Sequence, residues 1–253
     1  MNTVTSRDGT PIAFDRIGSG PPLIFALGAF NDRHTGQALA EWLSSDFTVY
    51  AYDRRGRGDS GDASPYAVDR EIEDLQAVMR HAGPEAYVFG FSSGAVLALN
   101  AAACGLPISR LALYEPPPTE GQAAAEHADK LAELVAAGRR GDAVEYFQKD
   151  IVGIPAEIVA QMRQSPFRPA LDAMAHTLVY EMRILGERRP VDNVQTPTLI
   201  VSGADSMGSD KLNQAAQALA KTMPNAEHLT LNGLNHDLVP EALGPELKRF
   251  FGG

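Results

Sequence analysis

The chain has 253 residues, 44% of them hydrophobic, and a formal net charge of −10. A chain of this length buries about 75% of its surface on folding, so it can fold without a disulfide or a metal. Its single cysteine, Cys104, excludes an internal disulfide and a cysteine-based metal cluster, and we expect it to be a small buried residue. The acidic balance disfavours unspecific binding to nucleic acid or to an anionic membrane.

The amino-terminal residues do not combine a basic start with an apolar stretch, and no secretory signal is visible. The longest apolar stretches fall well short of the roughly 20 residues that a membrane helix needs. The expected location is therefore cytoplasmic.

Hydrophobic patterns predict a regular alternation of elements along the chain. Asp8-Gly9 separates two short alternating runs, at 3–7 and 12–17, which predict an amino-terminal hairpin. Apolar runs of strand length follow at 23–27, 48–52, 87–91, 111–114 and 198–201, with a weaker one at 228–231. Helical patterns separate them at about 36–45, 67–82, 94–104, 210–222 and 240–251. Strands that alternate with helices predict an α/β fold with a mostly parallel sheet covered on both faces.

The interval 116–190 interrupts this alternation. It contains helical stretches punctuated by Pro155, Pro166 and Pro169, and no convincing strand. We expect a helical cap inserted into a single domain whose core is formed by residues 1–115 and 191–253. Aromatic and long apolar side chains in the cap suggest a mainly apolar pocket; they are Tyr146, Phe147, Met162, Phe167, Met174, Leu178, Tyr180 and Met182.

The first candidate for chemistry is Ser92, in Gly90-Phe91-Ser92-Ser93-Gly94. This G-x-S-x-G match follows an apolar strand and precedes a helical run, the context of a nucleophilic serine held in a tight turn. The flanking glycines are expected because side chains there would collide with neighbouring backbone. The alternative is a Gly/Ser turn in which Ser92 is only a helix cap.

A serine hydroxyl needs a base within hydrogen-bond reach to become a good nucleophile. Of six histidines, His236 is the strongest candidate because its turn-rich loop follows the last strand and precedes the final helix. Loops past the carboxyl ends of strands are where parallel sheets place reactive groups. A solvated loop histidine is the alternative.

The base in turn needs a carboxylate that fixes its tautomer. Asp205, shortly after the strand at 198–201, is the favoured acid. Glu115, at the end of the strand at 111–114, is the alternative.

Together these residues resemble the α/β-hydrolase superfamily over nearly the whole chain. Residues 53–60, Asp-Arg-Arg-Gly-Arg-Gly-Asp-Ser, are similar to the family loop that follows the fourth strand, and Gly203-Ala204-Asp205 and the loop 234–237 resemble its acid and histidine regions. The order Ser92, Asp205, His236 is the order of the family. The resemblance implies an eight-stranded sheet with the cap inserted after the sixth strand. It also implies the main-chain amides of Ala29 and Ser93 as oxyanion-hole donors, although Leu27 stands where the family commonly has histidine.

A serine at this position implies a carboxylesterase-like hydrolase that forms an acyl-enzyme with a small to medium, hydrophobic ester, thioester or lactone. A carbon–carbon bond hydrolase, a cofactor-free haloperoxidase and a non-catalytic ligand-binding member remain alternatives. Gly56, Gly58 and Gly61 formally match a dinucleotide-binding pattern. Residues 63–65, Ala-Ser-Pro, intervene before the next helix, so no helix amino terminus opens on the glycines to hold a pyrophosphate. We expect a small-molecule substrate, no cofactor, no metal and no membrane or nucleic-acid partner; the sequence does not indicate the oligomeric state.

Overall fold

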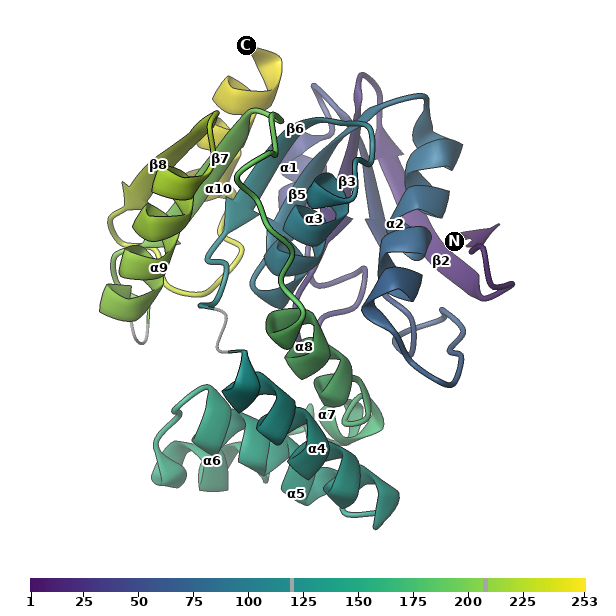
Figure 1. Ribbon diagram of the computed structural model, residues 1–253, viewed down its shortest axis with the longest axis vertical. Coiled ribbons are helices and arrows are strands. Elements are labelled where there is room, and N and C mark those ends of the chain that lie inside the picture. Colours follow the sequence, from purple (N-terminus) through teal and green to yellow (C-terminus); the bar gives the residue numbers. More distant parts are fainter. Residues whose placement is uncertain (119–120, 207–208) are drawn as a thin grey trace. The chain divides into compact units, whose positions relative to one another are not determined.

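The computed structural model describes residues 1–118, 121–206 and 209–253 (Figure 1). Its eight-stranded sheet has the order β1-β2-β4-β3-β5-β6-β7-β8. β1 and β2 pair antiparallel, β2 pairs antiparallel with β4, and all remaining pairs are parallel. The strands are β1 Asn2–Thr5, β2 Pro11–Gly18, β3 Pro22–Ala26, β4 Thr48–Tyr52, β5 Ala86–Phe91, β6 Ile108–Tyr114, β7 Thr198–Gly203 and β8 Ala226–Leu231. The prediction of a mostly parallel α/β sheet is confirmed.

Helices cover both faces of this sheet. α1 and α10 lie behind it in Figure 1, and α2, α3 and α9 lie in front. Their bounds are α1 Gln37–Leu43, α2 Val68–Ala82, α3 Ser93–Ala103, α9 Ser209–Thr222 and α10 Pro240–Gly252. Each helix predicted in the core is present, with its ends shifted by only a residue or two. Cys104 was expected to be buried, but it is exposed, because it follows the last residue of α3 where the chain leaves the core.

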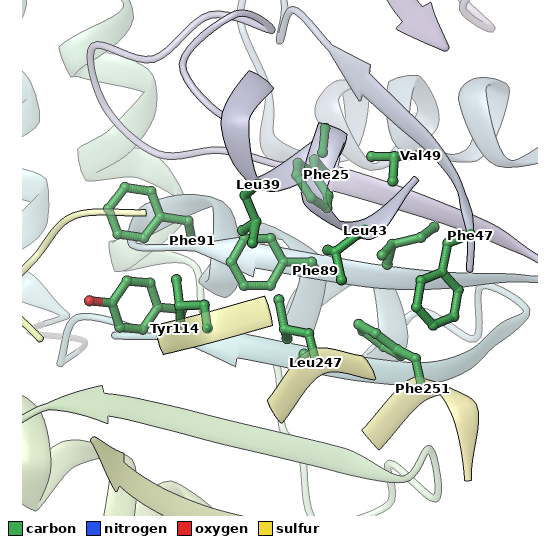
Figure 2. Packing of buried hydrophobic residues seen from close by; sticks show 14 of the residues in the cluster. Phe25, Leu39, Leu43, Phe47, Val49, Phe89, Phe91, Tyr114, Leu247 and Phe251 are labelled. Carbon is green, nitrogen blue, oxygen red and sulfur yellow. The ribbon is translucent and has the colours of Figure 1, made fainter. Parts of the chain in front are cut away.

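Large apolar side chains fill the space between the sheet and the pair α1 and α10 (Figure 2). Every residue of β4 is buried, as expected for a strand covered on both faces. Phe25 and Phe89 face each other from neighbouring strands, with ring centroids 5.1 Å apart. This packing fixes the carboxyl ends of β3, β5 and β6, where the candidate site lies.

Residues 1–118 and 188–253 form one compact unit, and residues 119–187 form a second, helical one. The second unit contains α4 Gln122–Ala136, α5 Arg140–Tyr146, the π-helix η1 Phe147–Ile151, α6 Ala156–Met162, α7 Arg168–Ala173 and α8 Thr177–Gly186. α4 and α8 pack against each other, and each contributes buried apolar residues. Phe147, Leu178 and Met182, expected to line a pocket, are buried, whereas Phe167 is exposed.

Within the described ranges, we find no helix with the length and apolar character needed to cross a membrane.

Candidate active site

Ser92 occupies the turn between β5 and α3 in a strained backbone conformation, with φ 55° and ψ −128°. Its N–H donates to the carbonyl of Tyr114 at 2.9 Å, which ties the turn to the end of β6. The flanking glycines permit close packing. A Cβ at position 90 would lie 2.5 Å from the Cα of Ala95, and one at position 94 would lie 2.2 Å from the carbonyl oxygen of Ala26. Strain of this kind costs about 1–3 kcal/mol and is concentrated at functional sites.

The loop after β3 lies directly against Ser92. A Cβ at position 28 would lie 2.8 Å from the Cβ of Ser92, so only glycine fits there. The next residue, Ala29, has a main-chain N–H that donates to no described backbone acceptor. Ser93 is the first residue of α3, so its N–H belongs to the unpaired amino-terminal turn of that helix. These are the two amides that the resemblance implies as oxyanion donors.

His236 lies in the loop between β8 and α10, next to the turn that carries Ser92. Its ring packs against the ring of Phe91, with centroids 4.7 Å apart, and Phe91 directly precedes Ser92. The hydroxyl of Tyr114 donates to the main-chain carbonyl of Asn235, which anchors the loop. The structure records no hydrogen bond between the Ser92 hydroxyl and the His236 ring. Such bonds are often long before substrate binds.

The carboxylate beside His236 is that of Glu115, at the end of β6. Glu115 is fully buried, and its Oε2 accepts a hydrogen bond from Nδ1 of His236. Its Oε1 accepts from the N–H of Gly203 at 2.9 Å and from the hydroxyl of Ser206 at 2.5 Å. Burial alone would raise the pKa of Glu115, but the hydrogen bonds from His236, Ser206 and Gly203 outweigh burial and hold that pKa below its ordinary value.

An ionised carboxylate can only accept hydrogen bonds, so Nδ1 of His236 must carry the proton. In the neutral ring this leaves the lone pair on Nε2. The contact with Glu115 therefore fixes the tautomer in which His236 can act as a base.

Asp205, the acid that the sequence favours, is exposed, and its carboxylate makes no hydrogen bond or ion pair with His236 among the described contacts. Its main-chain N–H donates to the carbonyl of Leu234 at 3.2 Å. The short turn after β7 thus directs Ser206, and not Asp205, toward the partner of His236. In this structure the carboxylate in contact with His236 is that of Glu115, the alternative acid, and not that of Asp205.

Three residues with strained backbone conformations lie at this edge of the sheet. In the described part of the chain, the non-glycine residues with positive φ are Phe30, Ser92 and Glu115, at 61°, 55° and 47°. They stand in the loop after β3, at the turn after β5 and at the end of β6. Ser92 and Glu115 are both candidate site residues, and strained residues of this kind cluster at functional sites.

The arginine-rich loop after β4 is buried and ion-paired. Arg54 bonds both carboxylate oxygens of Glu71, at 2.6 and 2.8 Å, and Arg55 bonds both oxygens of Asp74, at 2.7 Å each. A Cβ at position 58 would lie 2.1 Å from the Asp53 carboxylate, so this glycine makes room for a side chain of its own loop and not for a dinucleotide phosphate.

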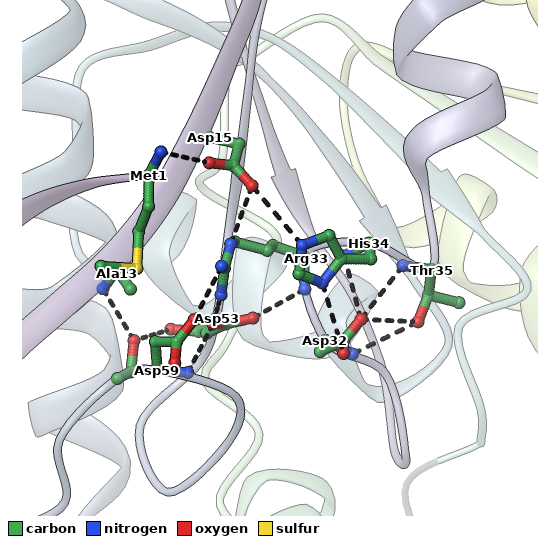
Figure 3. A network of polar contacts seen from close by, with 10 residues as sticks. Met1, Ala13, Asp15, Asp32, Arg33, His34, Thr35, Asp53 and Asp59 are labelled. Atoms are coloured by element: carbon green, nitrogen blue, oxygen red, sulfur yellow. Dashed lines mark hydrogen bonds and ion pairs between the residues drawn. The ribbon is translucent and has the colours of Figure 1, made fainter. Parts of the chain in front are cut away.

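A polar network joins the loops after β3 and β4 (Figure 3). Arg33 pairs with Asp15 at 2.8 Å, with Asp59 at 2.7 Å and with the buried Asp53. Asp53 also accepts the main-chain N–H groups of Arg33 and Asp59. The network holds the loop that borders Ser92 in place.

Among the residues that the structure describes, no cluster of three or more His, Cys, Asp or Glu side chains could hold a metal ion.

Comparisons with known proteins give consistent results. A model of the alpha/beta hydrolase family matches residues 26–242. The crystal structure of an alpha/beta hydrolase from Sphaerobacter thermophilus DSM 20745 is 48% identical and has a TM-score of 0.90, and the similarity covers 99% of this chain and 100% of that one.

Two curated relatives match over shorter stretches. N-formylmaleamate deformylase of Pseudomonas putida is 38% identical over 104 residues, which cover 40% of this chain and 39% of that protein. The uncharacterized hydrolase YraK of Bacillus subtilis is 34% identical over 96 residues, which cover 36% of this chain and 35% of that protein. The matches thus span less than half the length of these curated relatives.

Proposed function

Because this chain belongs to the α/β-hydrolase family, we propose that it is a serine hydrolase in which Ser92, His236 and Glu115 form the catalytic triad. The observation that supports the proposal most strongly is the buried, ionised Glu115 bonded to a histidine that packs beside the strained Ser92 turn.

In the proposed mechanism, Nε2 of His236 takes the proton of the Ser92 hydroxyl as Oγ attacks the substrate carbonyl. The amides of Ala29 and Ser93 stabilise the resulting oxyanion, and loss of one such donor costs about 3 kcal/mol of transition-state stabilisation. His236 then protonates the leaving group, which departs to give an acyl-enzyme. A water molecule activated by His236 hydrolyses this intermediate and regenerates Ser92.

The substrate class we propose is a small to medium, hydrophobic ester, thioester or lactone. An activated serine forms a covalent acyl intermediate, and this chemistry supports an ester-like substrate. One curated relative is a deformylase, so a formyl amide belongs among the compounds tested.

The test is a series of p-nitrophenyl esters of graded acyl length, with wild type and Ser92→Ala compared at equal concentration. We expect saturable hydrolysis by wild type and a loss of about 10⁴-fold or more in Ser92→Ala. A fluorophosphonate probe should label wild type and not the variant. Saturable activity that survives the substitution would contradict the serine mechanism, and a folded wild type that the probe does not label would favour a non-catalytic binding protein.

A further inference from the structure

Three successive carbonyls in the loop after β3 accept hydrogen bonds from side chains. The carbonyl of Leu27 accepts from Nη1 of Arg54 at 3.2 Å, that of Gly28 accepts from Nη1 of Arg57, and that of Ala29 accepts from Nδ2 of Asn31 at 2.7 Å. A loop whose carbonyl oxygens are all held in this way has little freedom to rotate its peptide units.

The bond to Gly28 has a direct consequence for the neighbouring amide. The Gly28 carbonyl and the Ala29 N–H belong to the same peptide unit, and in a planar trans peptide the two groups point in opposite directions. A guanidinium that fixes the carbonyl oxygen therefore fixes the direction of the N–H. Its positive charge also polarises the peptide, which strengthens the N–H as a donor.

Both arginines are placed at considerable energetic cost. Arg54 and Arg57 are each 2% exposed, and Arg54 is held by Glu71, which also accepts from the hydroxyl of Tyr66 at 2.9 Å. Burial and the neighbouring charge of Arg54 lower the pKa of Arg57 from its ordinary value. Desolvation and repulsion both disfavour a buried cation next to another cation. Such a costly arrangement indicates a role for Arg57 beyond filling space.

We propose that Arg57, with Arg54 behind it, is a positioning residue that holds the Gly28–Ala29 peptide so that the Ala29 N–H is aimed at the oxyanion beside Ser92. The proposal rests on the proposed serine mechanism, because it assigns Arg57 to the stabilisation of that mechanism's transition state. Arg57 does not touch the substrate; it acts through the peptide that it anchors.

The same loop supplies a matched control. Arg55 is fully buried and bonded to Asp74 and Asp8, but the carbonyl that it contacts is that of Arg70, on α2. If the arginines serve only to join loops, replacing Arg55 or Arg57 should affect catalysis equally. If Arg57 positions the oxyanion donor, only its replacement should weaken binding of the transition state.

The experiment compares Arg57→Met, Arg57→Lys and Arg55→Met with wild type, using p-nitrophenyl butyrate as substrate and phenylboronic acid as the analogue of the tetrahedral intermediate. Titration with the fluorophosphonate probe gives the concentration of folded sites in each sample, so that kcat is expressed per competent site. Thermal unfolding is recorded for all four proteins.

We expect Arg57→Met to lower kcat by about 10- to 100-fold while KM changes less than about threefold, because a misdirected donor weakens the transition state and not the ground state. The inhibition constant of phenylboronic acid should rise by a similar factor. Arg57→Lys keeps the charge and should recover part of both losses. Arg55→Met should lower the unfolding temperature, yet leave kcat per site and boronate inhibition within about twofold of wild type.

Two results would overturn the proposal: kcat and boronate inhibition in Arg57→Met that stay within about twofold of wild type, or equal losses in Arg57→Met and Arg55→Met. If Arg57→Met does not fold, Arg57→Lys decides by the same comparison, with a kcat loss above threefold supporting the proposal and a smaller one opposing it. Failure of the serine mechanism can be distinguished from failure of the role of Arg57. In the first case wild type itself is not labelled by the probe, or Ser92→Ala stays active. The role proposed for Arg57 would then be contradicted as well.

Discussion

The turns that follow β6 and β7 each offer a carboxylate at the same edge of the sheet, but the two are placed very differently. Glu115, after β6, is fully buried and accepts hydrogen bonds from His236, Gly203 and Ser206. Asp205, after β7, is exposed, and no described side chain or amide bonds its carboxylate.

The difference shows how the surroundings, and not the order along the chain, select a partner for a histidine. A buried carboxylate with three donors stays ionised and interacts strongly with a nearby imidazole, since little water screens the pair. An exposed carboxylate is solvated, and its influence on the same ring is weak. The end of β7 and the turn after it still contribute, because Gly203 and Ser206 supply two of the donors that keep Glu115 ionised.

The largest effect is expected for Glu115→Gln, which keeps the shape of the side chain and removes its charge. Without the carboxylate, His236 loses the partner that fixes its tautomer and stabilises its cation, so kcat should fall by about 10³- to 10⁴-fold. Steady-state hydrolysis of a p-nitrophenyl ester measures this loss. A fall of less than about tenfold would exclude Glu115 as the acid of the triad.

Gly203→Ala should have the next largest effect. A Cβ at this position would lie 2.2 Å from the carbonyl oxygen of Leu234 and 2.8 Å from the hydroxyl of Ser206, so the loop that carries His236 must move. We expect a loss of about 1–3 kcal/mol in the free energy of unfolding and a clear drop in kcat. Gly252→Ala, where a Cβ would meet open space, is the control and should change neither quantity.

Ser206→Ala removes one of the hydrogen bonds to the buried carboxylate. Such a bond to a charged group contributes about 1.5–3 kcal/mol, so kcat should fall by up to about 10- to 150-fold. Ser202→Ala is the matched control, because Ser202 is also buried but bonds His228 at 3.1 Å and not Glu115. An equal loss of kcat in both variants would mean that Ser206 acts only through packing.

Ser206→Ala should also change how the free energy of unfolding depends on pH. The pKa of Glu115 is lowered in the folded protein, so its ionised form stabilises the fold above the ordinary pKa near 4.5, and this contribution is lost as the pH falls through the lowered value. Without the Ser206 hydroxyl the folded-state pKa moves up toward the ordinary value. The decline of stability on acidification should therefore be smaller than in wild type and should be complete at a higher pH. Unfolding temperatures between about pH 3 and 6 test this, and Glu115→Gln should abolish the contribution altogether.

The smallest effect is expected for Asp205→Asn. An exposed carboxylate with no described partner should matter little, so kcat and KM should stay within about twofold of wild type. A loss of kcat comparable to that of Glu115→Gln would contradict this expectation and indicate that Asp205 is the acid of the triad.

Local patterns in the sequence were sufficient to predict the sheet, its helices and the tight turn at Ser92. These signals depend only on residues that are neighbours in the sequence. They are the apolar runs at 23–27 and 48–52 and the glycines around Ser92, which the structure places in β3, β4 and the turn after β5. The loop position of His236 is of the same kind, since it depends only on the strand before it and the helix after it.

The choice between the two carboxylates could not be made in this way. It depends on which side chain a short turn directs inward, and Glu115 and His236 are 121 positions apart in the chain. The one visible signal was that Asp205 stands two residues after Gly203, where the family that the sequence resembles more commonly has three. The buried state of Arg54 and Arg55 was also hidden, because their partners Glu71 and Asp74 lie on α2, 17 and 19 positions further along.

The most direct test of the pairing at this sheet edge is the NMR signal of the proton on Nδ1 of His236, assigned by its loss in His236→Gln. A proton held between an imidazole and an ionised carboxylate should give a strongly deshielded resonance. We predict that this resonance is present in wild type and in Asp205→Asn, and absent in Glu115→Gln. A resonance that persists in Glu115→Gln and disappears in Asp205→Asn would contradict the account.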